Sequence, residues 1–327
     1  MNILIVRIGR MGDMVMILPA IQAIRERHPE ATLYALTSRD GMRVLPFAGI
    51  DSEHMCDYRG QWWFRLAETL KVKRWVAAHH FDEIYCFEMK QRTVGWLPHS
   101  AQVLQSQASI QHYADRCLQL VLRQRTLALI PQPYLPLPVT QEDVVLRAYG
   151  VTPHTIVIGF HPTYSGFGKW GKQNQHKHRL WPESSFAALA LQLTAHARQQ
   201  GLDLKIVMSL LPDEQAFGQR LVARSQGSIV VLPGTPEFKA YLAYLQRLNV
   251  LVVSNTGVLH LAAALNTPVV ALFSRHNPED CGPYMAKGRY VVLRAEAMEN
   301  PELGLEAISV DNVLSATLRL LKETSHG

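Results

Sequence analysis

One short loop near the start of the chain combines residue types that bind an anion and move a proton. After the apolar run Ile3–Val6, the loop Arg7–Asp13 (RIGRMGD) holds two arginines, two glycines and one aspartate. Arginine binds phosphate and carboxylate groups, and glycine lets a ligand approach the backbone. Asp13 precedes an amphipathic segment, where it can serve as a helix N-cap or as a general base. The pattern alone leaves both roles open.

A long loop in the middle of the chain, residues 161–181 (HPTYSGFGKWGKQNQHKHRLW), is predicted to bind an anion. It follows a predicted strand and precedes a helix with Pro182 in its first turn. Its basic side chains can close over a diphosphate or an acidic acceptor, and a solvated basic loop is the alternative. These side chains are Lys169, Lys172, Lys177 and Arg179. His176 and His178 lack a third ligand in the pattern, so we predict no metal site.

A third pattern, Val252–Ala264 (VVSNTGVLHLAAA), contains the end of an apolar strand at Ser254 and the start of an apolar helix. A helix N-terminus offers unpaired N–H groups and a partial positive charge, which suit a phosphate. Gly257 allows close approach, and Thr256 can donate its hydroxyl. His260 lies one turn further, where it either reaches the same phosphates or is an ordinary buried histidine.

The three loops each follow a predicted strand. Ile3–Val6 and Ala31–Thr37 flank a predicted helix from Met14 to about Arg27, and such a βαβ unit implies a parallel sheet. The second half repeats this alternation. Its predicted strands are Thr155–Phe160, Leu204–Ser209, Ser228–Leu232, Val250–Ser254 and Pro268–Phe273. Open parallel sheets bind ligands beyond the carboxyl ends of their strands, which is where the three loops lie.

A proline-rich stretch, Leu129–Thr140 (LIPQPYLPLPVT), separates the two halves. Proline disfavours both helix interiors and central strands, so we interpret this stretch as a linker. We therefore predict two domains, residues 1–150 and 151–327, which suits a chain of 327 residues.

Composition narrows the class of protein. Hydrophobic residues make up 48% and charged residues 18%, which is typical of a globular protein. No apolar run approaches the roughly 18 residues of a membrane span, and Arg7 interrupts any signal peptide, so we expect a cytoplasmic protein. The net charge of +6 favours an anionic partner. The dinucleotide-binding and P-loop fingerprints are missing, and no nucleic-acid-binding module is recognised, so we expect no nucleic acid partner.

Three segments together resemble glycosyltransferase family 9, the ADP-heptose:lipopolysaccharide heptosyltransferases. They are RIGRMGDMVMILPAIQAI at the start, HPT…RLWPESSFAALA in the middle and SNTGVLHLAAALNTPVVALF late in the chain. Their order and spacing match the family over nearly the whole chain. The resemblance implies an α/β GT-B fold, in which two Rossmann-like domains with parallel sheets face a central cleft. Residues 1–150 would bind the acceptor and residues 151–327 the nucleotide sugar.

The resemblance also implies the reaction: inverting transfer of L-glycero-D-manno-heptose from ADP-heptose to the inner core of lipopolysaccharide, without a metal or another cofactor. Asp13 matches the family's general base, which domain closure would bring to the donor. Matching donor-binding positions are Thr163, Arg179, Asn255, Thr256, Gly257 and His260. The acidic residue that binds the ribose in relatives is Asp213 or Glu214.

Asn255 departs from the family, which usually has aspartate at this position. The change removes a negative charge beside the donor, so a glycosyltransferase that uses another ADP-, UDP- or GDP-sugar is the alternative function. A nucleotide- or polyanion-binding module without activity is a second alternative, but a base at the cleft argues against it.

The acceptor side is predicted from charge. We assign Arg7, Arg10 and Gly12 to an acceptor site, because the arginines can hold a phosphorylated inner core. That acceptor is anchored in the inner leaflet, so peripheral attachment to the membrane would be useful. A basic and aromatic stretch could provide it, or could be an ordinary partly exposed helix: Arg59, Trp62, Trp63, Arg65, Lys71, Lys73, Arg74 and Trp75.

Overall fold

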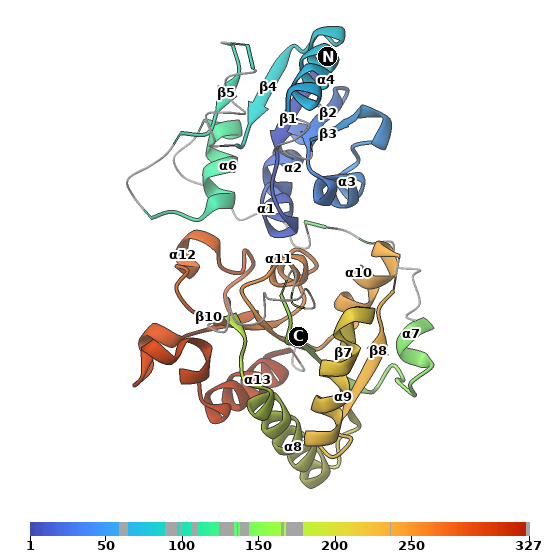
Figure 1. Cartoon of the computed structure of the whole chain (residues 1–327), viewed down its shortest axis with the longest axis vertical. Helices are drawn as coiled ribbons and strands as arrows, with labels where there is room; N and C mark the ends of the chain where they lie inside the picture. The colour runs from blue at the N-terminus through green and yellow to red at the C-terminus, as the bar shows by residue number, and fades with distance from the viewer. Residues whose placement is uncertain are drawn as a thin grey trace. The chain divides into compact units, whose positions relative to one another are not determined.

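The chain forms two compact units, Met1–Pro136 and Leu137–Gly327, in a computed structural model (Figure 1). The structure describes residues 1–58, 65–88, 97–98, 100–105, 110–123, 134–135, 137, 144–164, 167, 179–235 and 237–324. The boundary between the units falls inside the proline-rich stretch 129–140, most of which lies outside the described residues. It precedes the predicted boundary at residue 150.

The segment just before residue 150 belongs to the second unit. Helix α7 (Val144–Arg147) buries Leu146, whose carbonyl oxygen accepts a hydrogen bond from Val151 N. Arg247 then donates to the carbonyl oxygens of Thr152 and Thr155 and connects this segment to the rest of the unit.

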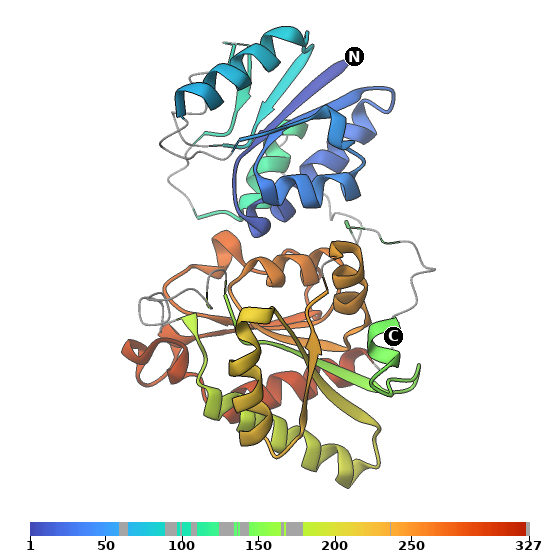
Figure 2. The same cartoon turned by 45° about the vertical axis from the view of Figure 1, so that its right-hand side comes forward.

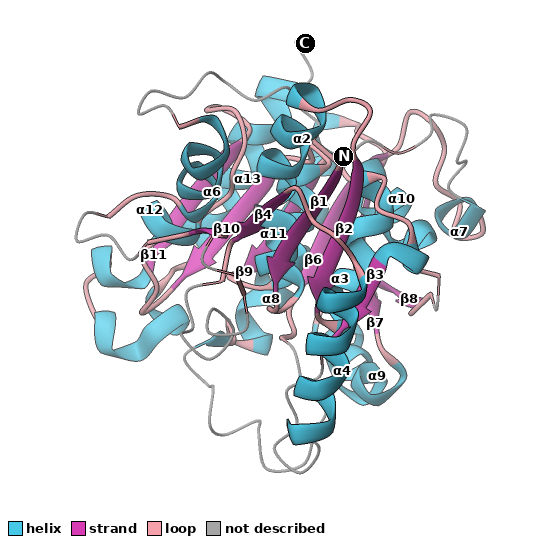
Figure 3. Cartoon of the chain, turned by 90° about the horizontal axis from the view of Figure 1, so that it is seen from above, coloured by secondary structure: helices cyan, strands magenta, loops and turns pink. Residues whose placement is uncertain are grey.

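Five strands form a parallel sheet in the described part of the first unit, in the order β3-β2-β1-β4-β5. They are β1 (Asn2–Arg7), β2 (Thr32–Thr37), β3 (Met55–Asp57), β4 (Glu83–Cys86) and β5 (Gln102–Val103). The predicted βαβ unit is confirmed, because β1 pairs in parallel with β2 from Asn2–Thr32 to Arg7–Thr37 (Figure 3). Strand β1 also pairs with β4, so the ends of these two strands lie side by side.

Helices cover this sheet, and the first of them differs from the prediction. The described helices are α1 (Met11–Met16), α2 (Leu18–Arg27), α3 (Arg39–Val44), α4 (Arg65–Ala78) and α6 (Tyr113–Leu122). A single helix from Met14 was expected, but α1 starts earlier and ends at a turn around Ile17. Pro19 has no N–H to donate to Val15, which explains the interruption.

Six strands form the parallel sheet in the described part of the second unit, in the order β11-β10-β9-β6-β7-β8. They are β6 (Ile156–His161), β7 (Leu204–Leu210), β8 (Ile229–Pro233), β9 (Val250–Ser254), β10 (Val269–Phe273) and β11 (Tyr290–Arg294). The first five confirm the predicted strands, and β11 was not predicted. Chain order reverses between β6 and β9, so this unit has its topological switch point there.

Helices lie on both faces of the second sheet (Figure 2). They are α8 (Glu183–Gln200), α9 (Gln215–Arg224), α10 (Phe238–Arg247), α11 (Gly257–Ala264), α12 (Pro278–Cys281) and α13 (Val310–Thr324). Trp181 is buried against Phe186 and donates its indole N–H to the Ile308 carbonyl oxygen at 2.9 Å. This contact fixes the residues just before α8 to the core. No described helix has the length and apolar character needed to cross a membrane.

Candidate active site

Asp13 lies in the first turn of α1, just beyond the end of β1. Its Oδ1 accepts from Arg7 Nη2 at 2.7 Å, and its Oδ2 accepts from the Arg10 backbone N–H at 2.8 Å. The N-cap interpretation is wrong, because α1 begins at Met11 and Arg10 is the N-cap residue. Asp13 instead reaches back from the third helical position. Its side chain remains 32% exposed, so the carboxylate is held in place and still open to a reactant.

Arg7 is buried at the end of β1, with a side chain only 10% exposed. Its Nη1 donates to Glu88 Oε1 at 3.2 Å, and its guanidinium carbon lies 4.8 Å from the centre of the Tyr113 ring. Burial lowers the pKa of Arg7, but its neighbours Tyr113, Asp13 and Glu88 outweigh burial and raise that pKa. The guanidinium is therefore charged and occupied by carboxylates of the same unit.

The other two predicted acceptor residues lie in different surroundings. Arg10 is exposed, whereas Gly12 is buried within α1. Gly9 was not predicted as a site residue, yet an added Cβ there would lie 2.5 Å from Asp13 Cβ. Ser38 Oγ donates to the Gly9 carbonyl oxygen at 2.6 Å and fixes the loop. Glycine at this position thus allows the loop to pass close to Asp13.

Sequence reasoning missed Glu88 and Tyr113. Glu88 follows β4, and a signal for it was present: an acidic residue directly after the apolar run Ile84–Phe87. Its Oε2 accepts from the Ile8 backbone N–H at 3.3 Å, so it bridges the ends of β1 and β4. Tyr113 comes from α6, and its hydroxyl donates to the Phe87 carbonyl oxygen.

The second unit places a group of polar side chains at its topological switch point. Strand β9 ends at Ser254, and Thr256 is the N-cap residue of α11. Thr256 makes no capping hydrogen bond with its side chain. Ser254 Oγ and Thr256 Oγ1 are both buried and have no hydrogen-bond partner among the described residues. Leaving a buried hydroxyl unpaired costs about 1–3 kcal/mol, so these two groups call for a ligand.

Arg179 connects the middle loop to this turn. Its Nη2 donates to the backbone carbonyl oxygen of Asn255 at 2.8 Å, and its guanidinium carbon lies 5.7 Å from the Tyr164 ring centre. Asn255 Nδ2 lies 3.6 Å from Cys281 Sγ. The structure therefore brings Arg179 and residues 254–257 together, as predicted. Lys169, Lys172, Lys177, His176 and His178 lie outside the described residues.

Four more predicted donor residues lie in this unit. Thr163, just beyond β6, is buried and hydrogen-bonds with Glu214. Glu214 is also buried, and burial raises the pKa of its carboxyl group. Asp213 is exposed. Of the two acidic candidates, Glu214 is thus the one joined to the loop that follows β6. His260 is buried in α11.

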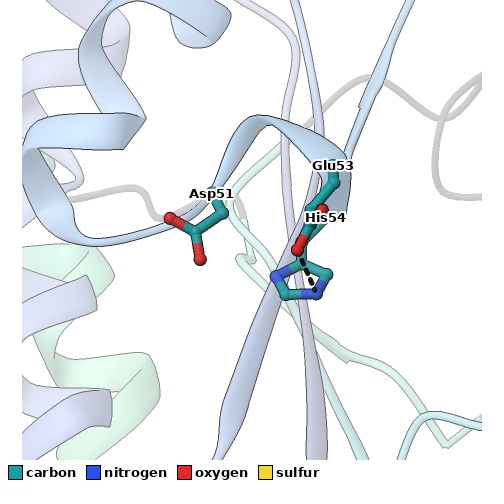
Figure 4. Close-up of side chains that lie close together, drawn as sticks. All are labelled: Asp51, Glu53 and His54. Atoms are coloured by element: carbon teal, nitrogen blue, oxygen red, sulfur yellow. Dashed lines mark ion pairs between the residues drawn. The ribbon is translucent and has the colours of Figure 1, made fainter.

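One group of possible metal ligands lies elsewhere in the first unit. Asp51, Glu53 and His54 offer ligand atoms within 4.8 Å of one another (Figure 4). They precede β3 and so lie at the amino ends of the parallel strands, whereas Asp13 lies beyond the carboxyl end of the central strand β1. Asp51 and Glu53 are exposed, and exposed acidic groups commonly gather without an ion. We assign no function to this group.

Comparison with known proteins identifies the chain. The model of "Glycosyltransferase family 9 (heptosyltransferase)" matches residues 84–306. The chain belongs to this family. The match includes the switch-point residues, and Asp13 lies before it. This glycosyltransferase is 24% identical to lipopolysaccharide heptosyltransferase 2 of Salmonella typhimurium, an alignment that covers 90% of this chain and 88% of that protein.

Solved structures agree on the fold. A glycosyl transferase family 9 protein from Veillonella parvula has a TM-score of 0.78 at 20% identity, covering 98% of this chain and 97% of that one. E. coli heptosyltransferase WaaC with ADP has a TM-score of 0.71 at 18% identity, covering 98% of this chain and all of that one (100%). The predicted α/β fold with two Rossmann-like parallel sheets, as in GT-B enzymes, is confirmed.

We expect the unpaired hydroxyl of Thr256 to contribute nothing to folding. Thr256→Val should leave the free energy of unfolding unchanged or raise it slightly, because the hydroxyl is buried without a partner. The matched control is Thr267→Val, since Thr267 is also buried but donates to the Leu245 carbonyl oxygen at 2.9 Å. That control should lower stability by about 1–3 kcal/mol in urea unfolding. An equal loss of stability in both variants would show that the Thr256 hydroxyl contributes to folding, and would contradict its assignment to a ligand.

Proposed function

We propose that this glycosyltransferase transfers L-glycero-D-manno-heptose from ADP-heptose to the inner core of lipopolysaccharide, with inversion. The observation that carries the proposal is the pair of buried, unpaired hydroxyls of Ser254 and Thr256 at the start of α11. A nucleotide diphosphate supplies the acceptor oxygens that these donors lack. The eight-residue helix α11 adds N–H groups and a partial positive charge at the same end.

The leaving diphosphate needs donors and cations as its negative charge grows. Arg179 is in place because its guanidinium already contacts the turn at Asn255. Gly257 begins α11 without a side chain, so an oxygen can approach the backbone there. We assign Thr163 and His260 to the same diphosphate. Glu214 is assigned to the ribose, since its contact with Thr163 connects it to this group.

Asp13 serves as the general base in this proposal. The acceptor hydroxyl transfers its proton to the Asp13 carboxylate as its oxygen attacks the anomeric carbon. The bond from that carbon to the diphosphate oxygen breaks on the opposite face, so the configuration inverts and ADP leaves. One partly exposed carboxylate with a fixed orientation is what this step needs.

Two comparisons support the choice of donor. One relative is a lipopolysaccharide heptosyltransferase, and the WaaC structure is described with ADP. Asn255 supports the alternative, a different ADP-sugar or a UDP- or GDP-sugar, because its side chain is uncharged and lies beside Cys281. ADP-heptose and these alternative nucleotide sugars would use the same diphosphate site and would differ in the contacts of the nucleobase and the sugar.

Thermal unfolding with a panel of nucleotides tests the donor. ADP and ADP-heptose should raise the melting temperature, whereas UDP, UDP-glucose and GDP-mannose should not, because only a ligand that binds the folded state stabilises it. At a hundred times the Kd, the stabilisation is about 2.7 kcal/mol. Arg179→Ala should weaken ADP binding about tenfold or more. The control Arg220→Ala removes an exposed arginine that pairs with Glu183 at 2.8 Å and should leave binding unchanged.

The other outcomes of the panel are also informative. A shift with UDP or GDP compounds alone would keep the diphosphate site and replace ADP-heptose as the donor. No shift with any nucleotide would contradict the assignment of residues 254–257 and Arg179.

Substitution of Asp13 tests the base. Asp13→Asn should lower kcat at least about a hundredfold, because an amide cannot accept the proton. The shift in melting temperature with ADP should stay as in the unchanged protein. The control Asp51→Asn removes an exposed carboxylate of the same unit and should keep full activity. An Asp13→Asn enzyme with normal turnover would refute the assignment.

We further propose that α4 attaches the enzyme to an anionic membrane surface, where the acceptor is anchored. Leu66 and Leu70 lie one turn apart on α4 and are 83% and 53% exposed. Among the side chains of α4 that the structure describes, the exposed basic ones are Lys71, Lys73 and Arg74. Exposed leucines beside basic residues suit an interface of anionic lipid. Lys71 lies 2.9 Å from Asp57, so Lys73 and Arg74 carry most of the attraction.

Trp75 fits the other interpretation of this stretch, an ordinary partly exposed helix, because it packs against the core of the first unit. Its ring packs against His79 at 5.0 Å and Phe81 at 5.9 Å, where it holds α4 to the unit. Arg59, Trp62 and Trp63, and the side chain of Arg65, lie outside the described part of the chain.

Vesicle sedimentation tests this surface. Leu66→Asp/Leu70→Asp should reduce binding to phosphatidylglycerol vesicles about tenfold or more, because it replaces two apolar side chains by negative charges. Vesicles of phosphatidylcholine alone should bind weakly in every case. Leu202→Asp, on the second unit at a residue 43% exposed, is the matched control. Unchanged binding by the double variant would show that α4 is not the attachment surface.

A further inference from the structure

Arg7 forms ion pairs with two carboxylates of its own unit, Asp13 and Glu88. We propose that Arg7 and Glu88 are positioning residues for Asp13: Arg7 fixes the carboxylate, and Glu88 keeps Arg7 in place when Asp13 takes up a proton. The inference rests on the proposed role of Asp13 as the base. It replaces the predicted role of Arg7 in acceptor binding.

The contacts of Arg7 divide between its two terminal nitrogens. Nη2 donates to Asp13 Oδ1 at 2.7 Å, while Nη1 donates to Glu88 Oε1 at 3.2 Å and to the Phe87 carbonyl oxygen at 3.4 Å. An anionic acceptor would have to displace one of these groups from a side chain that is 10% exposed. The exposed Arg10 is the better candidate for that acceptor.

Asp13 is held at both of its oxygens. Arg7 binds Oδ1, and the Arg10 backbone N–H binds Oδ2. Two donors from different directions fix the plane of the carboxylate, which a single contact would leave free to rotate. A base must lie within hydrogen-bond reach of the proton that it takes, so this orientation matters for the rate.

Protonation of Asp13 removes one negative charge next to Arg7, and Glu88 supplies a second negative charge that remains. Two carboxylates face one guanidinium, so the group of Arg7, Asp13 and Glu88 carries a formal charge of −1. When Asp13 takes the acceptor proton, the charge becomes zero and Arg7 stays paired with Glu88. With Asp13 as its sole partner, Arg7 would become a buried, unpaired cation, which costs several kcal/mol. Glu88 thus makes the protonated state of Asp13 accessible.

The remaining groups that face this cluster are uncharged near neutral pH. Tyr113 and Cys117 come from α6, and burial raises the pKa of both, that of Cys117 to about 12. The Tyr113 ring packs against the guanidinium at 4.8 Å. In the described residues, the charged groups around Asp13 are therefore Arg7 and Arg10 from its own loop and Glu88 from the end of β4.

Kinetics of single variants distinguish positioning from acceptor binding. Arg7→Met should lower kcat about tenfold or more and change the KM for truncated lipopolysaccharide less than about threefold. Arg25→Met is the matched control, since Arg25 donates to the carbonyl oxygens of Ala48 and Gly49 in the same unit and lies outside the site. A large rise in KM with kcat retained would overturn the inference.

The pH dependence of kcat gives a readout that a structural role would not move. Removing the positive charge in Arg7→Met makes protonation of Asp13 easier, so the acid limb should move to higher pH. Removing a negative charge in Glu88→Gln should move it to lower pH, each by roughly 1 unit. Glu88→Gln keeps the shape of the side chain, so it serves where Arg7→Met folds poorly. Shifts in the same direction, or none, would overturn the proposal.

A double variant separates this inference from the proposed function. If Arg7 acts through Asp13, then adding Arg7→Met to Asp13→Asn should lower kcat less than about threefold further. Effects that multiply would overturn the positioning role and leave Asp13 as the base. Normal turnover in Asp13→Asn alone would instead refute the base itself.

Discussion

The buried charge of Arg7 determines the geometry of the first unit's site. Parallel pairing places the ends of β1 and β4 side by side, between apolar residues on both strands. A guanidinium in such surroundings needs carboxylates and hydrogen-bond acceptors close to it. Glu88 at the end of β4 and Asp13 in α1 supply the charge, and Gly9 lets the loop pass close enough for Asp13 to reach it. The orientation of a candidate base thus follows from the cost of burying a cation.

The candidate site of the second unit is built mainly from uncharged polar groups. Between Ser254 and His260 the side chains are uncharged apart from what His260 could carry, and the groups at the turn are hydroxyls, an amide and the start of a helix. Arg179 is added from a separate loop. Buried donors that keep a fixed direction stabilise a developing charge without having to reorganise, which suits a leaving diphosphate. Their unpaired state costs stability in the absence of a ligand, and a ligand would return it.

The parallel sheets and the loops of the candidate site could be predicted from the sequence, because strands and loops have local sequence patterns. The alternation of β-branched runs with amphipathic segments predicted the parallel sheets, and the polar residues after each strand predicted the site loops. The break at Ile17 was missed although Pro19 was visible, since the apolar spacing continues through it. Strand β11 was missed although its five residues make it as long as β8, β9 and β10. The pairing of Arg7 with Glu88 joins residues far apart in the chain, and only the strand order brings them together.

The two polar sites also explain why an amide at residue 255 is compatible with a phosphate-binding turn. A carboxylate there would add a negative charge near the start of α11. Asn255 leaves that end of the helix without a negative charge, and its backbone carbonyl oxygen accepts from Arg179 whatever side chain stands there. In the first unit the opposite holds, because a base must carry negative charge and needs a cation to hold it. Each unit therefore carries the kind of group that its proposed step requires, a fixed carboxylate in the first and uncharged donors in the second, so substitutions at Asp13 and at Thr256 test the two steps separately.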